Sequence, residues 1–198
     1  MLVGSQSAHA AIVGDETFLL NQTSDWVVSL DVTPDGQYVF VSNYTDGSIS
    51  RFDTAASTVT NVSVCGHPYG VAVSPDGTKV AVACSGSNAV VYLGVESLTA
   101  QQTSGGNTPI AVTYNHAGTK VYSASETDDV FREIDASNPF SVNTVSITGT
   151  GWQAPFYIAI SPDDSKAYVS NIVSGTVSEI DLGTHTVART FTGFDSPL

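Results

Sequence analysis

Basic residues are scarce in this chain. Lysine and arginine total 6 against 19 aspartate and glutamate residues, which gives a formal net charge of −13 over 198 residues. Neutralising nucleic-acid phosphates requires clustered basic side chains, as does docking on an anionic bilayer. The composition therefore argues against nucleic-acid and anionic-membrane partners. The surplus acidic charge favours solubility, and it leaves a divalent-cation site open as a second interpretation.

Several sequence signals of catalysis or membrane insertion are also absent. No apolar run is long enough to cross a bilayer, so we expect no membrane span. The chain has no Gly-x-Ser-x-Gly elbow, His-Glu-x-x-His helix, Cys-x-x-Cys pair or phosphate loop. Gly149-Thr150-Gly151 precedes no helical pattern, which excludes a dinucleotide-binding loop. These absences favour a binding protein over an enzyme.

The strongest positive signal is a repeat of four turn-like tetrapeptides. They begin 41, 41 and 46 residues apart, which is the length of a four-stranded propeller blade. In the commonest form, Pro presets the backbone, Asp bonds locally and Gly accepts a positive φ. The four are Thr33-Pro34-Asp35-Gly36, Ser74-Pro75-Asp76-Gly77, Asn115-His116-Ala117-Gly118 and Ser161-Pro162-Asp163-Asp164.

Short apolar runs flank each turn in step with the repeat, and no 3.6-residue periodicity persists. Such runs, bounded by Gly, Pro, Asn and Asp, predict strands. The flanking pairs are 28–32 and 38–42, 70–73 and 79–83, 110–114 and 120–124, and 158–160 and 166–170. A third strand follows in every repeat, and a β-branched fourth run is visible at 59–64, 142–147 and 187–191. We therefore predict an all-β propeller of four-stranded antiparallel blades, about four full blades plus a partial one.

Two of these strands carry a recognisable signature. Phe40-Val41-Ser42-Asn43 and Tyr168-Val169-Ser170-Asn171 resemble the YVTN-family β-propeller repeat, and so do the Ser-Pro-Asp-Gly turns and Glu179-Ile180-Asp181 followed by Thr184. The resemblance covers nearly the whole chain. It implies a propeller of the kind found in surface-layer and secreted proteins, lactonase-type hydrolases and cofactor-bearing redox domains. A fold shared so widely does not fix the function.

The repeat also suggests boundaries within a single propeller or propeller fragment. We expect a partial blade with strands B to D at 1–23, then blades at 24–65, 66–105, 106–151 and 152–193, and the start of another strand at 194–198. The third blade carries an insertion. We therefore expect either a fragment of a larger propeller or a small five-bladed ring that is closed imperfectly or completed by a partner chain. Open blade edges invite pairing, so self-association is a further expectation.

The resemblance places ligands on the face formed by the loops between blades and between strands B and C. Its candidate ligand-binding residues are aromatic, amide or acidic: Trp26, Asn43, Asp46, His67, Tyr69, Trp152 and Asn171. Such a set suits a protein or carbohydrate ligand. Structural roles are the alternative, with Asn43 and Asn171 capping their strands and both tryptophans packed between blades.

Two smaller groups complete the candidate sites. Glu126, Asp128 and Asp129 offer oxygen ligands for Ca²⁺ or another divalent metal, and a solvated loop is the alternative. Cys65 and Cys84 end strands that reach the same face, so either a disulfide or two reduced thiols is consistent with the sequence.

The sequence and the family resemblance together imply three candidate functions. The first is a secreted or cell-surface binding or scaffold module, located outside the cell, on its surface or in the periplasm. The second is a lactonase-like hydrolase or lyase with a divalent metal near the propeller axis. The third is a fragment of a cofactor-bearing redox propeller. No cofactor is firmly indicated.

Overall fold

The computed structural model describes residues 26–104, 106–138, 141–147 and 152–197, and these form four antiparallel sheets. Blade 1 contains β1 (Val27–Val32), β2 (Tyr38–Asn43), β3 (Ser48–Asp53) and β4 (Thr58–Ser63). Blade 2 contains β5 (Pro68–Val73), β6 (Lys79–Cys84), β7 (Ala89–Gly94) and β8 (Ala100–Ser104). Blade 3 contains β9 (Pro109–Tyr114), β10 (Lys120–Ser125), β11 (Val130–Asp135) and β12 (Val142–Ser146). Blade 4 contains β13 (Pro155–Ile160), β14 (Lys166–Asn171), β15 (Thr176–Asp181) and β16 (Thr186–Thr192).

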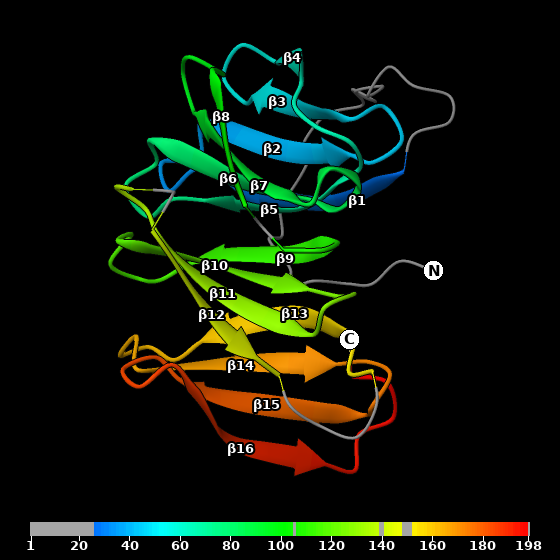
Figure 1. Cartoon of the computed structure of the whole chain (residues 1–198). Coiled ribbons are helices and arrows are strands. Elements are labelled where there is room, and N and C mark those ends of the chain that lie inside the picture. Colours follow the sequence, from blue (N-terminus) through cyan, green and yellow to red (C-terminus); the bar gives the residue numbers. More distant parts are fainter. Residues whose placement is uncertain (1–25, 105, 139–140, 148–151, 198) are drawn as a thin grey trace.

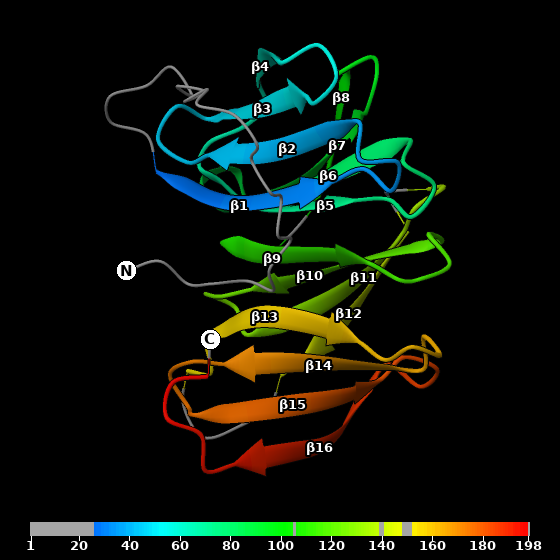
Figure 2. The ribbon, with the colours of Figure 1, turned by 180° about the vertical axis from the view of Figure 1, so that it is seen from behind.

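Each sheet runs in sequence order from its first strand to its fourth. The first strands, β1, β5, β9 and β13, lie side by side, while the fourth strands lie at the periphery (Figures 1 and 2). This is the propeller arrangement that the repeat predicts, and each blade is the antiparallel four-stranded unit expected. The strands predicted within 1–23 lie outside the described residues, and 194–197 contain no strand.

One single-turn 3₁₀ helix, η1 (Ser85–Ser87), joins β6 to β7. It ends at Asn88 in the left-handed conformation, which asparagine tolerates better than most residues. No helix among the described residues has the length and apolar character needed to cross a bilayer.

The hydrophobic core lies between the blades. Phe40 and Ile49 of blade 1 pack with Val80 and Leu93 of blade 2, and all four side chains are almost completely buried. Similar clusters join blade 2 to blade 3 and blade 3 to blade 4. Each large apolar side chain removed from water contributes roughly 1.5–3 kcal/mol, so the stacking of neighbouring blades stabilises the array.

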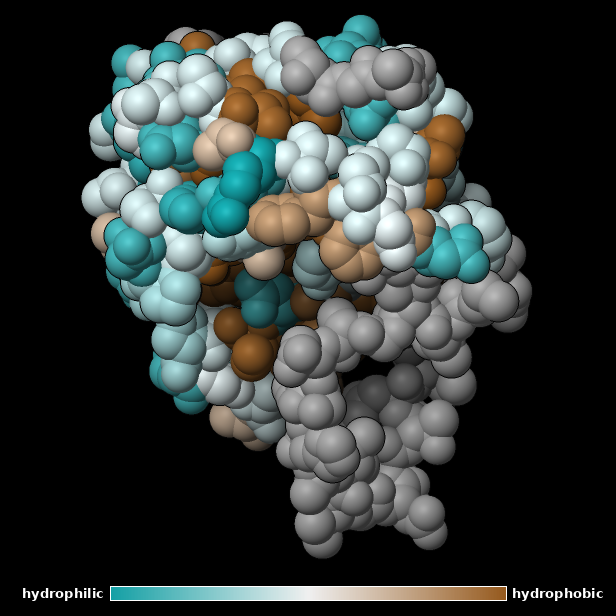
Figure 3. Space-filling view, turned by 90° about the horizontal axis from the view of Figure 1, so that it is seen from below, coloured by the Kyte–Doolittle hydropathy of each residue, from teal (hydrophilic) through white to brown (hydrophobic). Residues whose placement is uncertain are grey.

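The two ends of the stack expose apolar side chains that an interior blade buries. Leu30 and Val32 on β1 are 55% and 39% exposed, whereas Val71 and Val73, in the equivalent positions of β5, pack into the core between blades 1 and 2. At the blade 4 end, Tyr157 is 50% exposed. Figure 3 looks onto that end and shows hydrophobic atoms in a central hollow, among more polar surface. Both ends therefore resemble blade-to-blade interfaces.

The turn between the first two strands is held the same way in every blade. Its first side chain accepts a hydrogen bond from the backbone five residues later, as in Ser74 Oγ with Lys79 N at 2.9 Å and Ser161 Oγ with Lys166 N at 2.9 Å. In blade 3, Asn115 Oδ1 accepts the bond from Lys120 N at 2.9 Å. The turn therefore survives the loss of the usual sequence because an amide oxygen replaces the hydroxyl.

The first turns of neighbouring blades also contact one another. This contact explains why His116 and Asp164 depart from the repeat together. A Cβ on Gly77 would lie 3.3 Å from Pro34 Cδ, and one on Gly118 would lie 3.4 Å from Pro75 Cδ. Glycine in one turn therefore packs closely on the proline of the turn before it.

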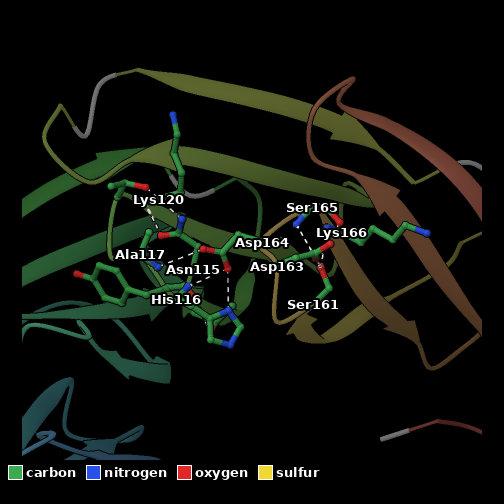
Figure 4. A network of polar contacts seen from close by, with 12 residues as sticks. Asn115, His116, Ala117, Lys120, Ser161, Asp163, Asp164, Ser165 and Lys166 are labelled. Atoms are coloured by element: carbon green, nitrogen blue, oxygen red, sulfur yellow. Dashed lines mark hydrogen bonds and ion pairs between the residues drawn. The ribbon is translucent and has the colours of Figure 1, made fainter.

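Between blades 3 and 4 this pair is replaced by histidine and aspartate. Asp164 Oδ1 accepts hydrogen bonds from His116 N at 3.0 Å and lies 2.7 Å from His116 Nδ1, while Asp164 Oδ2 accepts one from Ala117 N at 3.1 Å (Figure 4). Proline could not donate the first bond, because it has no backbone N–H. Burial disfavours the Asp164 charge, but the bonds from His116 and Ala117 outweigh it and hold its pKa below 3.8.

Blade 4 also contains a buried carboxylate with two cationic partners. Glu179 on β15 lies 2.7 Å from Arg189 on β16 and 2.9 Å from Lys166 on β14. These hydrogen bonds, first from Arg189 and then from Lys166, lower the pKa of Glu179 to about 2. A charge in this position needs such partners, since an unpaired buried carboxylate would be strongly destabilising.

Candidate functional site

Five aromatic rings form a connected group on the face predicted to bind ligands. Tyr44 stacks on His67 with ring centroids 4.6 Å apart and meets Trp26 at 6.1 Å. Tyr69 meets Tyr44 edge-on at 6.0 Å and Phe156 edge-on at 6.0 Å. The rings come from blades 1, 2 and 4, and we call them the aromatic face. They cross the inner strands, because β5 and β13 begin with Pro-Tyr and Pro-Phe at the same end of the stack.

Backbone contacts fix the histidine in this group. His67 has a φ of 51°, and its carbonyl oxygen accepts hydrogen bonds from Ser85 N and Ser85 Oγ, both at 3.0 Å. The loop between blades 1 and 2 is thus tied to the B-to-C loop of blade 2. These hydrogen bonds fix the backbone of His67, whose imidazole stacks on Tyr44.

The third blade borders the aromatic face with an acidic loop. Burial, followed by the charge of Glu126 and the nearby Tyr44, raises the pKa of Tyr69, so its hydroxyl stays protonated at neutral pH. The Trp152 indole donates a hydrogen bond to the Glu126 carbonyl oxygen at 2.7 Å. A neutral phenol, an indole and a carboxylate thus lie around one surface.

The two tryptophans do not pack between blades, contrary to the structural alternative drawn from the sequence. Trp26 is 72% exposed and Trp152 is 50% exposed. The loops that carry them end at the surface, and the inner strands that follow supply the smaller side chains that fill the interfaces. Both indoles are therefore available to a ligand.

A shallow depression of about 530 Å³ adjoins the aromatic face. Asp46 and His67 line it, together with the backbone around Gly47 and Cys65. Gly47 has a φ of 68°, and a Cβ there would lie 2.6 Å from the Cys65 carbonyl oxygen, so only glycine fits this loop. Asp46 is thus placed beside the histidine, as expected for a residue on this face.

Cys65 and Cys84 form a disulfide with a Cα–Cα distance of 6.0 Å. This is the first of the two possibilities left open by the sequence. The bond links the end of blade 1 to the end of β6 in blade 2. It therefore fixes the two blades beneath His67.

The two asparagines hold their strands instead of facing a ligand. Asn43 Nδ2 donates to Ser48 Oγ at 3.0 Å and to Ser50 Oγ at 2.8 Å. Asn171 Nδ2 donates to Thr176 Oγ1 at 3.0 Å and to Ser178 Oγ at 2.9 Å. Both side chains are buried. The structural role considered for them in the sequence is therefore the one observed, and they lie beneath the site.

The acidic run is also engaged in local contacts. Asp129 Oδ1 accepts hydrogen bonds from the backbone of Gln153 and Ala154, both at 3.0 Å. Asp128 Oδ2 lies 3.4 Å from Arg132 Nη2. Within the described parts of the chain, no three His, Cys, Asp or Glu side chains gather as a metal site. The structure thus separates Glu126, Asp128 and Asp129, and a cation held by all three stays a prediction.

Tyr44 and Phe156 belong to the site although neither was among the residues selected from the sequence. Each lies in a loop or strand start that the repeat assigns to this face, so its position was predictable. Its contact with the other rings was not, because the contact depends on how blades 1, 2 and 4 converge. Aromatic residues at these positions were the available signal.

Comparisons with known proteins support the architecture. A family described as "Lactonase, 7-bladed beta-propeller" matches residues 15–100. Hydrazine synthase of Kuenenia stuttgartiensis is similar in structure, with a TM-score of 0.78, 20% sequence identity, and coverage of 90% of this chain and 53% of that chain. Dihydro-heme d1 dehydrogenase NirN in complex with DHE has a TM-score of 0.69 and 19% identity, with coverage of 83% and 37%. No curated protein matches the sequence.

These matches agree with the repeat in the sequence and with the four sheets. At about 20% identity the solved structures show the fold alone. The chain spans about half of the first structure and less of the second. The repeat, the blades and the matches together identify this chain as a β-propeller repeat protein.

Proposed function

We propose that the chain is a binding module whose aromatic face receives a protein or carbohydrate ligand. The supporting observation is the connected group of Trp26, Tyr44, His67, Tyr69 and Phe156 on one surface. Aromatic side chains offer large, rigid contact areas, and Tyr and Trp add a polar edge for hydrogen bonding. They are also enriched among the residues that dominate binding energies at interfaces.

The location we propose is extracellular, at the cell surface or in the periplasm. The Cys65–Cys84 disulfide supports it, because such bonds persist in oxidising compartments and are uncommon in the cytosol. An exposed aromatic surface suits a module that meets partners outside the cell.

Intrinsic fluorescence provides a direct test of this proposal. The chain contains two tryptophans, Trp26 and Trp152, and both lie on or beside the aromatic face. Ligands found on a glycan array or peptide library should change the tryptophan emission on titration. Y69A should weaken binding by about tenfold or more, as expected for a central aromatic contact.

The matched control is Y157A, because Tyr157 is an exposed tyrosine at the blade 4 end, and its ring pairs with none of the five aromatic rings described. It should bind as the wild type does. Equal affinities of Y69A and wild type for every ligand, with no change in emission, would contradict the proposal.

A lactonase-like hydrolase or lyase is the second candidate, supported by the family match over residues 15–100. Its test is hydrolysis of γ- and δ-lactones followed by pH-stat titration, with Ca²⁺, Mg²⁺ or Zn²⁺ and with EDTA. A rate that rises with one metal and falls with EDTA would support it. Rates equal to the buffer blank under every condition would exclude it for those substrates.

A fragment of a cofactor-bearing redox propeller is the third candidate. Its support is that one structurally similar protein is named as a haem d1-related dehydrogenase. Titration with haem, followed by the Soret absorbance band, tests it. A saturable shift of the band would support this function, and an unchanged spectrum would contradict it.

We also propose self-association through the exposed ends of the blade stack. Leu30 and Val32 support it, because their counterparts in blade 2 are covered by a neighbouring blade. Analytical ultracentrifugation of the wild type and L30D tests the idea. A concentration-dependent dimer that L30D dissociates is the expected result, and a monomer at all concentrations would refute it.

A further inference from the structure

A second pocket lies on the opposite side of the propeller from the aromatic face. It has a volume of about 380 Å³ and is bordered by the first turns of blades 2 and 3 and by the chain following β11. Two of the six basic residues in the chain, Lys79 and Lys120, line it together with Tyr114. Neither the repeat nor the comparisons assign it a role.

Tyr114 differs from its counterparts in the other blades. It ends β9, and the corresponding ends of β1, β5 and β13 are Val32, Val73 and Ile160. The side chain is 7% exposed, and its hydroxyl is buried without a hydrogen-bond partner among the described residues. Burial, followed by the charge of Asp76, raises its pKa, so the hydroxyl remains a neutral donor. A buried hydroxyl that bonds to nothing is costly. Tyr92 on β7 also has a buried hydroxyl without a partner among the described residues, and its pKa is raised by burial and then by Tyr114.

Lys79 lines the same pocket as Tyr114 and has unused donors. Its Nζ donates one hydrogen bond, to the Ala136 carbonyl oxygen at 3.2 Å. The equivalent lysines, Lys120 and Lys166, pair with carboxylates on the third strand of their own blades. Blade 2 carries Tyr92 at that carboxylate position, and Lys79 forms no ion pair within the described residues.

The charges lining the pocket limit the kind of ligand. The lining residues include two lysines and two carboxylates, Asp76 and Asp135. Lys120 lies 3.5 Å from Asp135 and 3.4 Å from Glu133, so Lys79 is the lining cation that remains for a ligand. The Oδ1 atoms of both carboxylates accept hydrogen bonds from their own turns. The pocket therefore offers unused donors within a region of little net charge. A ligand with one negative charge and a compact apolar part fits this balance better than a multiply charged phosphate.

We propose that this pocket binds a small organic monocarboxylate, with Lys79 Nζ and the Tyr114 hydroxyl donating hydrogen bonds to its oxygens. The proposal concerns a site separate from the aromatic face and holds whether or not that face binds a ligand. The acid would complete the bonding of a hydroxyl that the protein leaves unpaired. The volume is within the range of pockets that hold small organic molecules.

Thermal melting with acetate, lactate and benzoate tests the proposal, with chloride at the same ionic strength as reference. At ten times its dissociation constant, a carboxylate that binds only the folded state should raise the melting temperature by about 3–6 °C. Y114F and K79M should each lose at least half of this shift. Without carboxylate, Y114F should melt at or above the wild-type temperature, because it removes the unpaired hydroxyl.

Y157F is the matched control, because it removes a hydroxyl at the blade 4 end and should keep the full shift. K79M gives an independent reading in case Y114F perturbs the core. No shift with any of the three acids, measured by melting and by calorimetric titration, would overturn the proposal. An equal shift in wild type, Y114F and K79M would also overturn it, since the acid would then bind elsewhere.

Discussion

The exchange of proline and glycine for His116 and Asp164 can be tested by a double-mutant cycle. The variants are H116P, D164G and H116P/D164G, and the double variant restores the Pro–Gly contact found between the other turns. Each single variant disrupts the hydrogen bonds between His116 and Asp164. The double variant replaces these bonds with a Pro–Gly packing contact, so it should be more stable than the two single effects predict. The cycle therefore measures the coupling between blades 3 and 4 at this contact.

The structure sets the size of the expected effect. A hydrogen bond to a charged group contributes about 1.5–3 kcal/mol in favourable cases. Asp164 is 22% exposed and His116 is 59% exposed, so we assign about 1–2 kcal/mol to their whole set of contacts. Glycine at position 164 would recover roughly 0.5–1 kcal/mol, because the site has a φ of 55°. D164G should therefore destabilise only slightly, by roughly 0.5–1 kcal/mol.

H116P should lose the N–H bond to Asp164 and leave the aspartate with fewer donors. We expect the double variant to be more stable than the sum of the single variants by about 1 kcal/mol, or about 2–4 °C. Urea unfolding followed by circular dichroism measures all four proteins. Because the pKa of Asp164 is lowered, the coupling should be complete above pH 3.8 and decrease as the pH falls through the folded-state pKa. Additivity within about 0.3 kcal/mol at pH 7 would refute the reasoning.

Three further predictions concern groups that stabilise blade 4 or join blade 1 to blade 2. The pKa of Glu179 is about 2 in the folded state, against an ordinary value of 4.5, so its contribution to stability should be lost as pH falls from 4.5 towards 2. In this pH window the melting temperature of the wild type should therefore depend more steeply on pH than that of E179Q. Reducing the Cys65–Cys84 disulfide, or replacing both cysteines in C65S/C84S, should lower the free energy of unfolding by about 3 kcal/mol. Urea unfolding measures this change, and a loss below about 0.5 kcal/mol would contradict the prediction. N171A removes an amide that donates two buried hydrogen bonds and should cost about 2–3 kcal/mol in the same assay, whereas a neutral effect would mean that the hydroxyls find other partners.

Most of the fold was predictable because every blade repeats similar turn residues and strand patterns. The Ser-Pro-Asp-Gly turns, the apolar runs beside them and the period in the low forties define three of the four strands in each blade. β8 (Ala100–Ser104) is the exception. Its sequence, Ala-Gln-Gln-Thr-Ser, lacks the β-branched pattern of the other fourth strands, yet it pairs with β7 along its length. An edge strand needs little apolar surface, so tertiary pairing decides its conformation.

The candidate site was predictable in position more than in detail. The repeat assigned His67, Tyr69 and Trp152 to one face, and the structure places them there. It did not reveal that Tyr44 would stack on His67, because this contact joins two blades. The disulfide was left open for the same reason, since the distance between Cys65 and Cys84 depends on the packing of blade 1 against blade 2.

The pocket between blades 2 and 3 could not be inferred from the sequence. In the sequence, Tyr114 is one more aromatic residue in an inner strand, and Lys79 is one of three equivalent lysines. Their difference appears only when the partners of each lysine are compared across blades. The departure of one repeat from the others is thus the useful signal, and it becomes visible once the neighbours of each residue are known.

The last residue of each second strand has a consequence for assembly. This position is asparagine in blades 1 and 4, where Asn43 and Asn171 make equivalent hydrogen bonds, but it is Cys84 in blade 2 and Ser125 in blade 3. A chain of near-identical repeats risks pairing each unit with the wrong neighbour during folding, the failure typical of repeat proteins. Here a blade in the wrong place would leave Cys65 without its partner sulfur and Asp164 without His116. These irregular contacts thus favour the native pairing of blade 1 with blade 2 and of blade 3 with blade 4.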